Sequence, residues 1–582
     1  MLPPHMDRRP PEPESEEINL YITTYYSLLR STGEVRVRAF EEAHAYSGSS
    51  LHLGALSDVP DLSAFAYAAA RLPDEMIDVE LVILGQSHEL FEAAGYDVRR
   101  WTIVKTRGRR RPLRHDGNKL GVFIASASDI DDLVPILTAY QIEWNKMHER
   151  LRRGAPSAEA LQSMAKDPVA LSGALGVGVD DAQKLMDAFG PKRLDRGIRS
   201  LFERRSDLKV RMLAASHSQY QRAAQRWWGA IEPSYIREKE PRRPPVYFIS
   251  SNTHAIANLV GGYAQSHMDE IVTWARQTNP EGLGAEIDRA AKSGDPSELA
   301  PLLYYLLRGY IHAAANTKKM HEVRAFEASH GLVHLSEPGH IDVDAQIAKL
   351  NELDPTLIDP RLRIPGIERL KDSDAVILNI DYPLGMAAYH LLSRLGQGVG
   401  DLRGIYVMGK AATLNGRVGD VMISGNVYDE HSLNTFLFRN AFTARDIAPW
   451  LRHGSVFDNQ KAVTVRSAFL QSKEYMDAFY SSGYTVLEME AGPFLGGVYE
   501  LVNPKRVPSD EIVHLSAHTS FDVGLLHYAS DTPYSRRQSL LSKSLSFFGV
   551  DATYACAIAI VRRILELEVQ RLAGNEPVGR TA

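Results

Sequence analysis

The stretch that most constrains the fold runs from Ile405 to Ser424, in the last third of the chain. It begins with a short, apolar and partly β-branched run, Ile405 to Met408, which predicts a buried strand that ends in a turn at Gly409. A second turn is predicted at Asn415–Gly416, and Val421 begins the next strand. Because ligands of α/β sheets lie at the carboxyl ends of strands, the small residues indicate either a ligand site or a tight connection between two core strands.

The bulk composition excludes several classes of protein. The 582 residues are too many for one ordinary core, so we expect two or three domains. A hydrophobic content of 44% and a charged content of 24% are typical of a globular protein. The net charge of −6 gives no indication of a nucleic-acid partner, and no apolar run reaches the roughly 18 residues of a membrane span. The single cysteine, Cys556, excludes internal disulfides and a cysteine-rich zinc site. We therefore expect a cytoplasmic protein with no metal site and no nucleic-acid or membrane partner.

The chain pattern predicts a tail followed by two α/β domains. Residues 1–17, rich in proline and charge, are expected to be disordered. Residues 18–240 are expected to form an N-terminal α/β domain with a helical segment at about 157–230, and the charged stretch 238–245 marks its end. Residues 246–575 are expected to form a mixed central sheet flanked by helices, with a helical insertion at about 264–330. Its later elements include a strand at 485–490, a last strand at 524–528 and an amphipathic helix at 551–571.

An internal echo indicates that the N-terminal half is related to the C-terminal half, or is a degenerate copy of it. Three short matches occur in the same order: 25–30 with 304–308, 37–44 with 323–330, and 51–53 with 333–335. In the second pair, Arg, Glu and His recur at a spacing that puts them on one helix face. That face is either a salt-bridged packing surface or gives Glu327 or His330 a functional role.

Four motifs of the C-terminal half, taken together, resemble those of the nucleoside phosphorylase and nucleosidase superfamily. They occur in that family's order: the Asp381–Ala388 join with Gly385, the Gly-rich stretch 408–421, the Met-Glu-Ala segment 489–491, and the Ser-Asp segment 530–531. The resemblance covers about 375–570 and extends back to 246 if Val246–Ser250 is the first strand of the domain. Three features depart from the family pattern: Lys410 replaces a small residue, Gly492–Pro493 interrupts the usual helix, and 428–450 resembles an insertion.

The resemblance implies roles for individual residues in cleaving the N-glycosidic bond of a purine-type nucleoside or nucleotide. Glu490 would accept hydrogen bonds from the ribose hydroxyls, and Asp531 would protonate the leaving base, which requires a raised pKa. Met489 would pack under the ribose, and main-chain groups around Gly409, Lys410 and Ala411 would line the pocket. Further candidate ligands are Asp381, Gly385, Glu488, Asn252 and His254. Without the resemblance, Glu490 would be an ordinary strand-end carboxylate, Asp531 a turn residue, and Asn252 and His254 helix caps.

Hydrolysis is favoured over phosphorolysis, in which phosphate would be the co-substrate. Phosphate binding needs cationic or helix-N-terminal donors, and the relevant loop begins with Asp381, which would repel an anion. Glu327 and Glu488 are the candidates for activating the water, and no cofactor is expected. The family usually assembles, so we expect a homo-oligomer. The alternatives are a non-catalytic protein that keeps the pocket for nucleoside binding or assembly, and a phosphosugar-handling enzyme.

Overall fold

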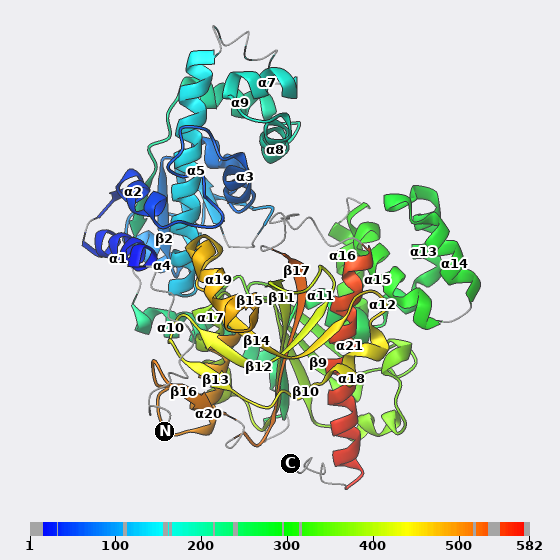
Figure 1. The fold of residues 1–582 in the computed structure, drawn as a ribbon. Helices are drawn as coiled ribbons and strands as arrows, with labels where there is room; N and C mark the ends of the chain where they lie inside the picture. The colour runs from blue at the N-terminus through cyan, green and yellow to red at the C-terminus, as the bar shows by residue number, and fades with distance from the viewer. Residues whose placement is uncertain are drawn as a thin grey trace.

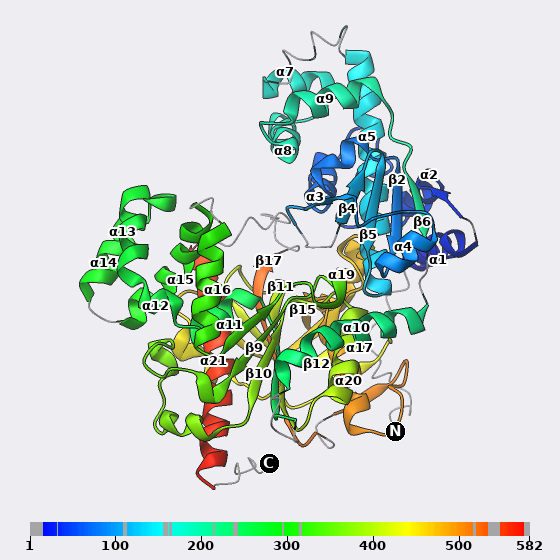
Figure 2. The same ribbon diagram turned by 180° about the vertical axis from the view of Figure 1, so that it is seen from behind.

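The computed structural model has two lobes, one above the other in Figures 1 and 2. It describes residues 16–574 except 32, 109–112, 155–156, 158–160, 162–163, 165, 214–215, 237–242, 294–295, 314–316, 516–518 and 533–546. The expected tail, apart from Glu16 and Glu17, and most of the expected boundary at 238–245 lie outside the described residues. Helix α1 (Glu16–Ser31) includes the last two residues of that expected tail.

The N-terminal lobe, residues 16–213, is built on a six-stranded mixed sheet in the order β1-β6-β2-β5-β4-β3. Its strands are β1 (Val35–Arg36), β2 (Leu81–Gly85), β3 (Thr102–Val104), β4 (Leu113–Asp116), β5 (Lys119–Phe123) and β6 (Lys209–Met212). Its helices besides α1 are α2 (Arg38–Tyr46), α3 (Leu62–Ala70), α4 (His88–Ala93), α5 (Ala127–Gly154), α7 (Pro168–Leu175), α8 (Val179–Phe189) and α9 (Leu194–Glu203). Strand β6 lies inside the stretch predicted to be all-helical, because β1 and β2 supply its pairing partners.

The C-terminal lobe, residues 217–574, is built on an eleven-stranded mixed sheet. Its strands are β7 (Val246–Ser250), β8 (Leu332–Leu335), β9 (Ala345–Lys349), β10 (Val376–Ile380), β11 (Leu402–Thr413), β12 (Val421–Asp429), β13 (Thr435–Leu437), β14 (Val456–Thr464), β15 (Tyr484–Glu488), β16 (Ile512–His514) and β17 (Asp522–Asp531). Its helices are α10 (His217–Tyr235), α11 (Thr253–Val260), α12 (Tyr263–Ser266), α13 (Met268–Thr278), α14 (Gly284–Ser293), α15 (Pro296–Ala313), α16 (Thr317–Ser329), α17 (Met386–Gly398), α18 (Ala444–Ile447), α19 (Lys473–Ser481), α20 (Ala491–Val502) and α21 (Phe547–Leu572). The expected α/β class, with a mixed sheet flanked by helices, is confirmed.

Part of the large sheet closes on itself. Strand β11 pairs with β17, β17 with β12, β12 with β14, β14 with β15, and β15 returns to β11. The five strands therefore form a ring that leaves no free edge among them, so their backbone groups are satisfied within the ring. The rest of the sheet extends from β11 through β7, β10 and β9 to β8, and from β12 through β13 to β16.

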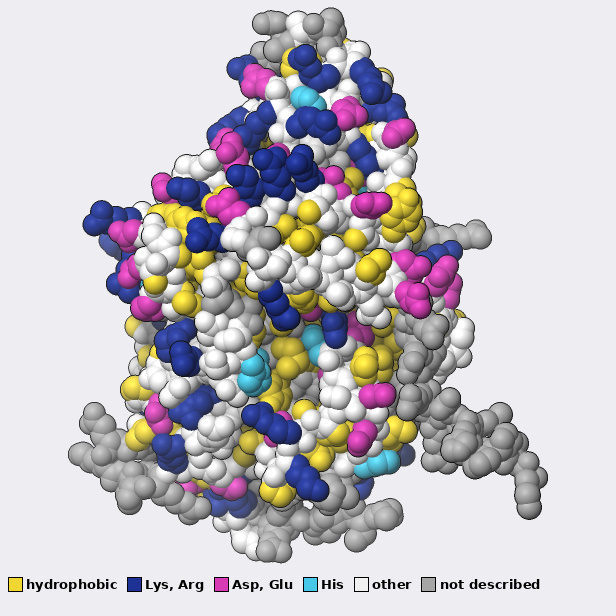
Figure 3. All heavy atoms as spheres, turned by 90° about the vertical axis from the view of Figure 1, so that its left-hand side faces the viewer, with side chains coloured by type: hydrophobic (Ala, Val, Ile, Leu, Met, Phe, Trp, Pro, Cys, Tyr) yellow, Lys and Arg dark blue, Asp and Glu magenta, His cyan; other side chains and the backbone are white. Residues whose placement is uncertain are grey.

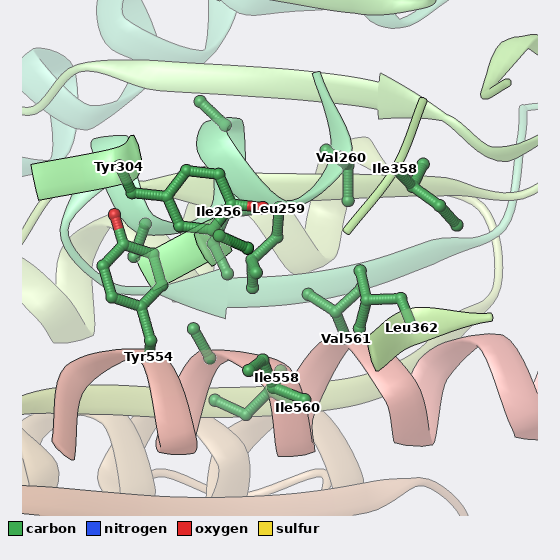
Figure 4. Close-up of a cluster of buried hydrophobic side chains, with 14 of the residues drawn as sticks. Ile256, Leu259, Val260, Tyr304, Ile358, Leu362, Tyr554, Ile558, Ile560 and Val561 are labelled. Atoms are coloured by element: carbon green, nitrogen blue, oxygen red, sulfur yellow. The ribbon is translucent and has the colours of Figure 1, made fainter. Parts of the chain in front are cut away.

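Helix α21 is the packing centre of one face of this sheet (Figure 4). Ile558, Ile560 and Val561 of α21 lie close to Ile256 and Leu259 of α11 in that view, and all five side chains are fully buried. Residues 552–561 are buried all round, because the sheet covers one side and α11 and α15 cover another. The predicted helix at 551–571 is therefore confirmed, but its first half is a core helix and not an amphipathic one.

Helix α10 packs with the C-terminal lobe, although the predicted boundary near residue 240 would place it in the N-terminal domain. Trp227 and Trp228 are buried in a cluster with Leu391 and Leu392 of α17. Conversely, Phe469 and Leu470, which follow β14, pack into the N-terminal core. One apolar segment of the C-terminal lobe thus packs into the core of the N-terminal lobe.

The predicted turn at Gly409 is wrong. Strand β11 continues through Gly409 to Thr413, with a bulge between Ala411 and Ala412. The backbone keeps its hydrogen-bond partners beyond Gly409, because β17 pairs with it as far as Ala412 and β15 takes over on the other side at Ala412 and Thr413. The turn at Asn415–Gly416 and the strand from Val421 are confirmed.

The prediction for 485–490 needs two corrections. Strand β15 ends at Glu488, and Glu490 is the N-cap residue of α20, so strand alternation does not place the two glutamates on one face. Gly492 and Pro493 do not interrupt the helix: they lie in the first turn of α20, where a proline lacks no needed donor. The proline pattern suggested a break only because the helix start was placed wrongly.

The internal echo is only partly reproduced in the structure. The first two matched pairs fall on helices α1 and α2 and on α15 and α16. The third does not match, since 51–53 is a turn whereas 333–335 lies in β8. Within the described part of the chain, no helix combines the length and apolar character needed to cross a bilayer.

Candidate functional site

Four parallel neighbours place their carboxyl ends at one edge of the C-terminal sheet. Strand β7 lies between β10 and β11, β17 pairs with the other side of β11, and all of these pairings are parallel. In both Figure 1 and Figure 2 the end of β17 points toward the N-terminal lobe. This edge is where ligands of α/β sheets bind.

Of the predicted site residues, Gly409 and Glu490 lie together, beside the rings of Tyr382 and His527. A Cβ atom at Gly409 would lie 3.7 Å from Oε2 of Glu490, 3.8 Å from Cε1 of Tyr382 and 4.0 Å from Cδ2 of His527. Glu490 and Tyr382 are half-buried, whereas Gly409 and His527 are buried. The glycine thus leaves a space, about the size of a methyl group, between a carboxylate and two rings. Glu490 and Gly409 are brought together as the sequence predicted.

Glu488 serves the helix that begins beside this space. Its Oε2 accepts hydrogen bonds from the amides of Glu490 and Ala491, each 2.7 Å long, and its Oε1 accepts one from the Thr464 hydroxyl. Burial raises the pKa of Glu488 to about 7, although these hydrogen bonds oppose the rise. The carboxylate therefore fixes the backbone that carries Glu490, and the prediction that Glu488 activates water does not fit these contacts.

His527 was not found from the sequence, although it is next to Glu490 across Gly409. It is fully buried, and neither ring nitrogen has a hydrogen-bond partner among the described residues. Its Nε2 lies 3.8 Å from Oε2 of Glu488, which is too long for a hydrogen bond. Burial lowers the pKa of His527 to about 4, so the ring is neutral at physiological pH. The one sequence signal was a polar residue within the apolar strand 524–528.

Asp531 lies at the end of β17, opposite Ala412 of β11. Its Oδ2 accepts a hydrogen bond of 2.7 Å from the Ser530 hydroxyl, and its Oδ1 is buried with no partner among the described residues. Burial raises the pKa of Asp531, while Ser530, Lys410 and Arg71 oppose the rise. A raised pKa is what protonation of a leaving group requires.

Three cationic side chains from different elements surround this end of the sheet. Arg71, which follows α3 of the N-terminal lobe, and Lys410 of β11 carry positive charges that oppose the rise in the pKa of Asp531. The positive charge of Arg308 of α15 adds to the lowering of the Lys410 pKa by burial. None of the three forms an ion pair within the described ranges. At the end of β17, three cationic side chains thus surround the single carboxyl group of Asp531.

The remaining predicted ligands divide into nearby and distant ones. The Asn252 side chain is the N-cap of α11, where it accepts a hydrogen bond from the Ala255 amide. It also hydrogen-bonds the hydroxyls of Tyr382 and Tyr528. Burial raises the pKa values of both tyrosines, and these hydrogen bonds reduce the rise. Those two hydroxyls are 2.9 Å apart. Asp381 accepts from the amide of Tyr382. Asn252 and Asp381 therefore lie near the space at Gly409, because both contact Tyr382, which borders it.

Other predicted residues serve the packing. Ala411 is part of the apolar core, and Met489 packs against the cluster that contains Leu414 and Leu487. His254 is exposed on the first turn of α11. Glu327 is buried and accepts a hydrogen bond of 2.6 Å from His334, which favours a structural role.

Gly385 lies at the boundary between the lobes, at the start of α17. The Met386 amide donates a hydrogen bond of 2.9 Å to the hydroxyl of Ser128, which belongs to α5. The N-terminus of α17 is thus covered by a side chain of the other lobe. An anion would compete with Ser128 for this position.

Among the described residues, no group of three or more His, Cys, Asp or Glu side chains is arranged to hold a metal ion.

The fold and the site describe a mixed α/β protein with a polar site at the carboxyl ends of parallel strands. Residues 37–566 match a family designated DUF6909, described as a family of unknown function, and the chain belongs to this family. No curated protein matches the sequence.

Several solved structures share a part of the fold. A candidate methylthioadenosine nucleosidase from Weissella paramesenteroides is 13% identical, with 39% of this chain and 86% of that one covered, at a TM-score of 0.25. A uridine phosphorylase from Schistosoma mansoni, in complex with 5-fluorouracil, is 14% identical over 34% and 72%, at 0.25. A purine nucleoside phosphorylase from Toxoplasma gondii, in complex with immucillin-H, is 13% identical over 33% and 75%, at 0.23. Scores this low leave the function to be argued from the site.

Proposed function

We propose that this protein cleaves the N-glycosidic bond of a purine-type nucleoside or nucleotide, with water as the nucleophile. The observation that carries the proposal is the convergence of Glu490 and Gly409 on one space beside β11, with Asp531 at the end of the neighbouring strand. These residues belong to three motifs that resemble, in order, those of the nucleoside phosphorylase and nucleosidase superfamily.

The chemistry needs two carboxyl groups in different protonation states. Bond cleavage places positive charge on the ribose, and the ionised Glu490 would accept hydrogen bonds from the ribose hydroxyls and stabilise that charge. The base departs with negative charge, and a protonated Asp531 would neutralise it by donating its proton. The raised pKa of Asp531 supports this assignment.

Water is the favoured nucleophile because the start of α17 is not open to phosphate. Ser128 covers the Met386 amide there, and Asp381 lies four residues before Gly385. The cations Arg71, Lys410 and Arg308 lie on the Asp531 side instead. They favour a substrate with an anionic group, so a nucleotide is the better candidate than a nucleoside.

The alternative is a protein that binds the nucleotide without cleaving it. Lys410 favours this alternative, because an exposed cation lies where the nucleoside phosphorylase and nucleosidase superfamily has a small residue. In either case we expect the chain to act as a homo-oligomer, as members of that superfamily usually do.

The test measures base release by chromatography from purine and pyrimidine nucleosides and their 5′-monophosphates. We expect the wild type to release a purine from the monophosphate. Asp531→Asn and Glu490→Gln should lower kcat/KM by on the order of 100-fold or more. Gly409→Ala should fold normally, since its Cβ would make ordinary contacts at 3.7–4.0 Å, yet it should not bind substrate.

Glu500→Gln is the matched control, because Glu500 lies near the other end of α20 and bonds Tyr389. It should leave kcat/KM unchanged. Tight binding of the nucleotide with no base release by the wild type would establish the binding protein instead. Absence of both binding and release would overturn the proposed function.

A further inference from the structure

A chain of three hydrogen-bonded side chains crosses the boundary between the lobes. Ser128 Oγ of α5 lies 3.0 Å from Nε2 of His431, and Nδ1 of His431 lies 2.9 Å from Oδ1 of Asp429. Ser128 is fully buried, and the side chains of His431 and Asp429 are 7% and 3% exposed. No sequence motif predicted this arrangement, because Ser128 and His431 are 303 residues apart.

The hydrogen bonds run in one direction. The Met386 amide donates to Ser128, so the Ser128 hydroxyl is free to donate to Nε2 of His431. Nδ1–H of His431 then donates to Asp429, which also accepts from the Ser432 hydroxyl. Burial raises the pKa of Asp429, but the hydrogen bonds from His431 and Ser432 outweigh it, so the pKa lies below its usual value and Asp429 stays ionised.

The order Ser, His, Asp is also that of hydrolase triads, but these contacts do not suit a nucleophile. Ser128 has no exposed surface, and its oxygen already accepts the Met386 amide proton. An acyl substrate has no route to this oxygen while the lobes are packed together. Any effect of the three side chains is therefore on the position of the elements that they contact.

Each end of the chain touches an element that carries a residue of the proposed site. At one end, Gly385 has φ +49° and ψ −120°, and a Cβ there would lie 2.7 Å from Cβ of Ser128 and 3.1 Å from Nε2 of His431. Tyr382, which borders the space at Gly409, is three residues away. Only glycine accommodates both this backbone and this contact.

At the other end, a Cβ on Gly492 would lie 2.7 Å from Oδ1 of Asp429. Gly492 is in the first turn of α20, two residues after Glu490. Asp429 is thus packed directly against the helix start that holds Glu490. Its negative charge is also favourable at this N-terminus.

We propose that Ser128 is a positioning residue of the site in the other lobe, acting through His431 and Asp429 on the start of α20 and through the Met386 amide on the Gly385 turn. The N-terminal lobe thereby completes a site to which it contributes no reacting group. The catalytic consequence rests on the proposed function, whereas the structural coupling does not.

The first test is independent of activity. Hydrogen–deuterium exchange of the full chain is compared for wild type, Ser128→Ala and His431→Ala, in peptides that cover 386–392 and 490–498. Ser128→Ala should speed exchange about tenfold both at Met386 and in the first turn of α20, as the loss of one buried hydrogen bond predicts. The double variant Ser128→Ala/His431→Ala should match the single variants, because each substitution breaks the same chain of hydrogen bonds.

Ser467→Ala is the matched control. Ser467 is equally buried next to the segment that enters the N-terminal core, and its hydroxyl has no hydrogen-bond partner among the described residues. It should leave both peptides unchanged. Unchanged exchange at 490–498 in Ser128→Ala would overturn the proposal, even if Met386 is affected.

The second test uses base release from the nucleotide. Ser128→Ala should lower kcat about tenfold and leave KM nearly unchanged, since the misplaced Glu490 acts mainly in the transition state. An unchanged kcat in a variant with altered exchange would limit the coupling to structure and overturn the positioning role. If the wild type releases no base, the proposed function fails, and the exchange experiment still decides the coupling.

Discussion

Two fully buried histidines, His52 of the N-terminal lobe and His527 of the C-terminal lobe, each lie beside a fully buried glutamate, but the two pairs differ in how their hydrogen bonds are used. In the N-terminal lobe, Nε2 of His52 lies 2.6 Å from Glu143, and Nδ1 of His52 lies 2.8 Å from His44. Glu143 also accepts from Lys146 and from the Asp61 amide, each at 2.6 Å. Every polar atom of the His52–Glu143 pair is satisfied, as expected for a structural network.

In the C-terminal lobe, His527 and Glu488 are equally buried but 3.8 Å apart, and the ring nitrogens have no partner in the described ranges. Glu488 is directed to the amides of Glu490 and Ala491 instead. The same two residue types thus form a hydrogen-bonded pair in one lobe. In the other lobe they lie apart, and the glutamate accepts hydrogen bonds from the backbone of the candidate site. Unsatisfied buried polar groups of this kind occur at functional sites.

The largest effect is expected from breaking the satisfied pair. Glu143→Ala leaves Nε2 of the buried His52 without its partner and removes the counter-ion of the half-buried Lys146, so it should lower the free energy of unfolding by about 3–5 kcal/mol. The measurement is urea unfolding fitted with separate transitions for the two lobes. Glu149→Ala on the same helix removes a half-exposed ion pair with Arg205 and should change stability by only about 0.5 kcal/mol. Equal effects of the two variants would contradict the structural role of the pair.

A pH-dependent effect is expected at Glu488. Its pKa is about 7 in the folded chain and about 4.3 when unfolded, so the folded state binds more protons between these values. The wild type should therefore lose stability as pH rises from about 4.3 to 7, by on the order of 2–3 kcal/mol. Glu488→Gln cannot ionise and should escape this loss while it keeps the bonds to α20. Melting temperatures at pH 4 and pH 7.5 decide: a difference from wild type that is the same at both values would refute the assignment.

The smallest effect is expected from His527→Leu. Neither ring nitrogen has a hydrogen-bond partner in the part of the chain that the structure describes, so the free energy of unfolding should change by less than about 1 kcal/mol, or rise. His52→Leu removes two hydrogen bonds and is the contrasting variant. Urea unfolding of both variants tests this, and a loss at His527 as large as at His52 would show that its nitrogens are engaged after all.

The local elements could be predicted from the sequence because their signals are local. The strand at 246–250 and the join around Gly385 lie where the structure has β7 and the start of α17. The sequence predicts that strand β11 ends at Gly409, because a glycine indicates a turn unless the partner strands are known. Those partners, β15 and β17, lie 73 to 119 residues away along the chain.

Residue types and short spacings predict the α/β class and the order of the C-terminal motifs. Glu490 and Asp531 became candidate residues because those motifs resemble the nucleoside phosphorylase and nucleosidase superfamily. Only the tertiary structure decided that Glu490 faces Gly409, that His527 lies beside them, and that Ser128 of the other lobe holds the Gly385 turn. The physical reason is that burial and long-range strand register, which no short stretch encodes, determine which polar groups meet and which keep a partner.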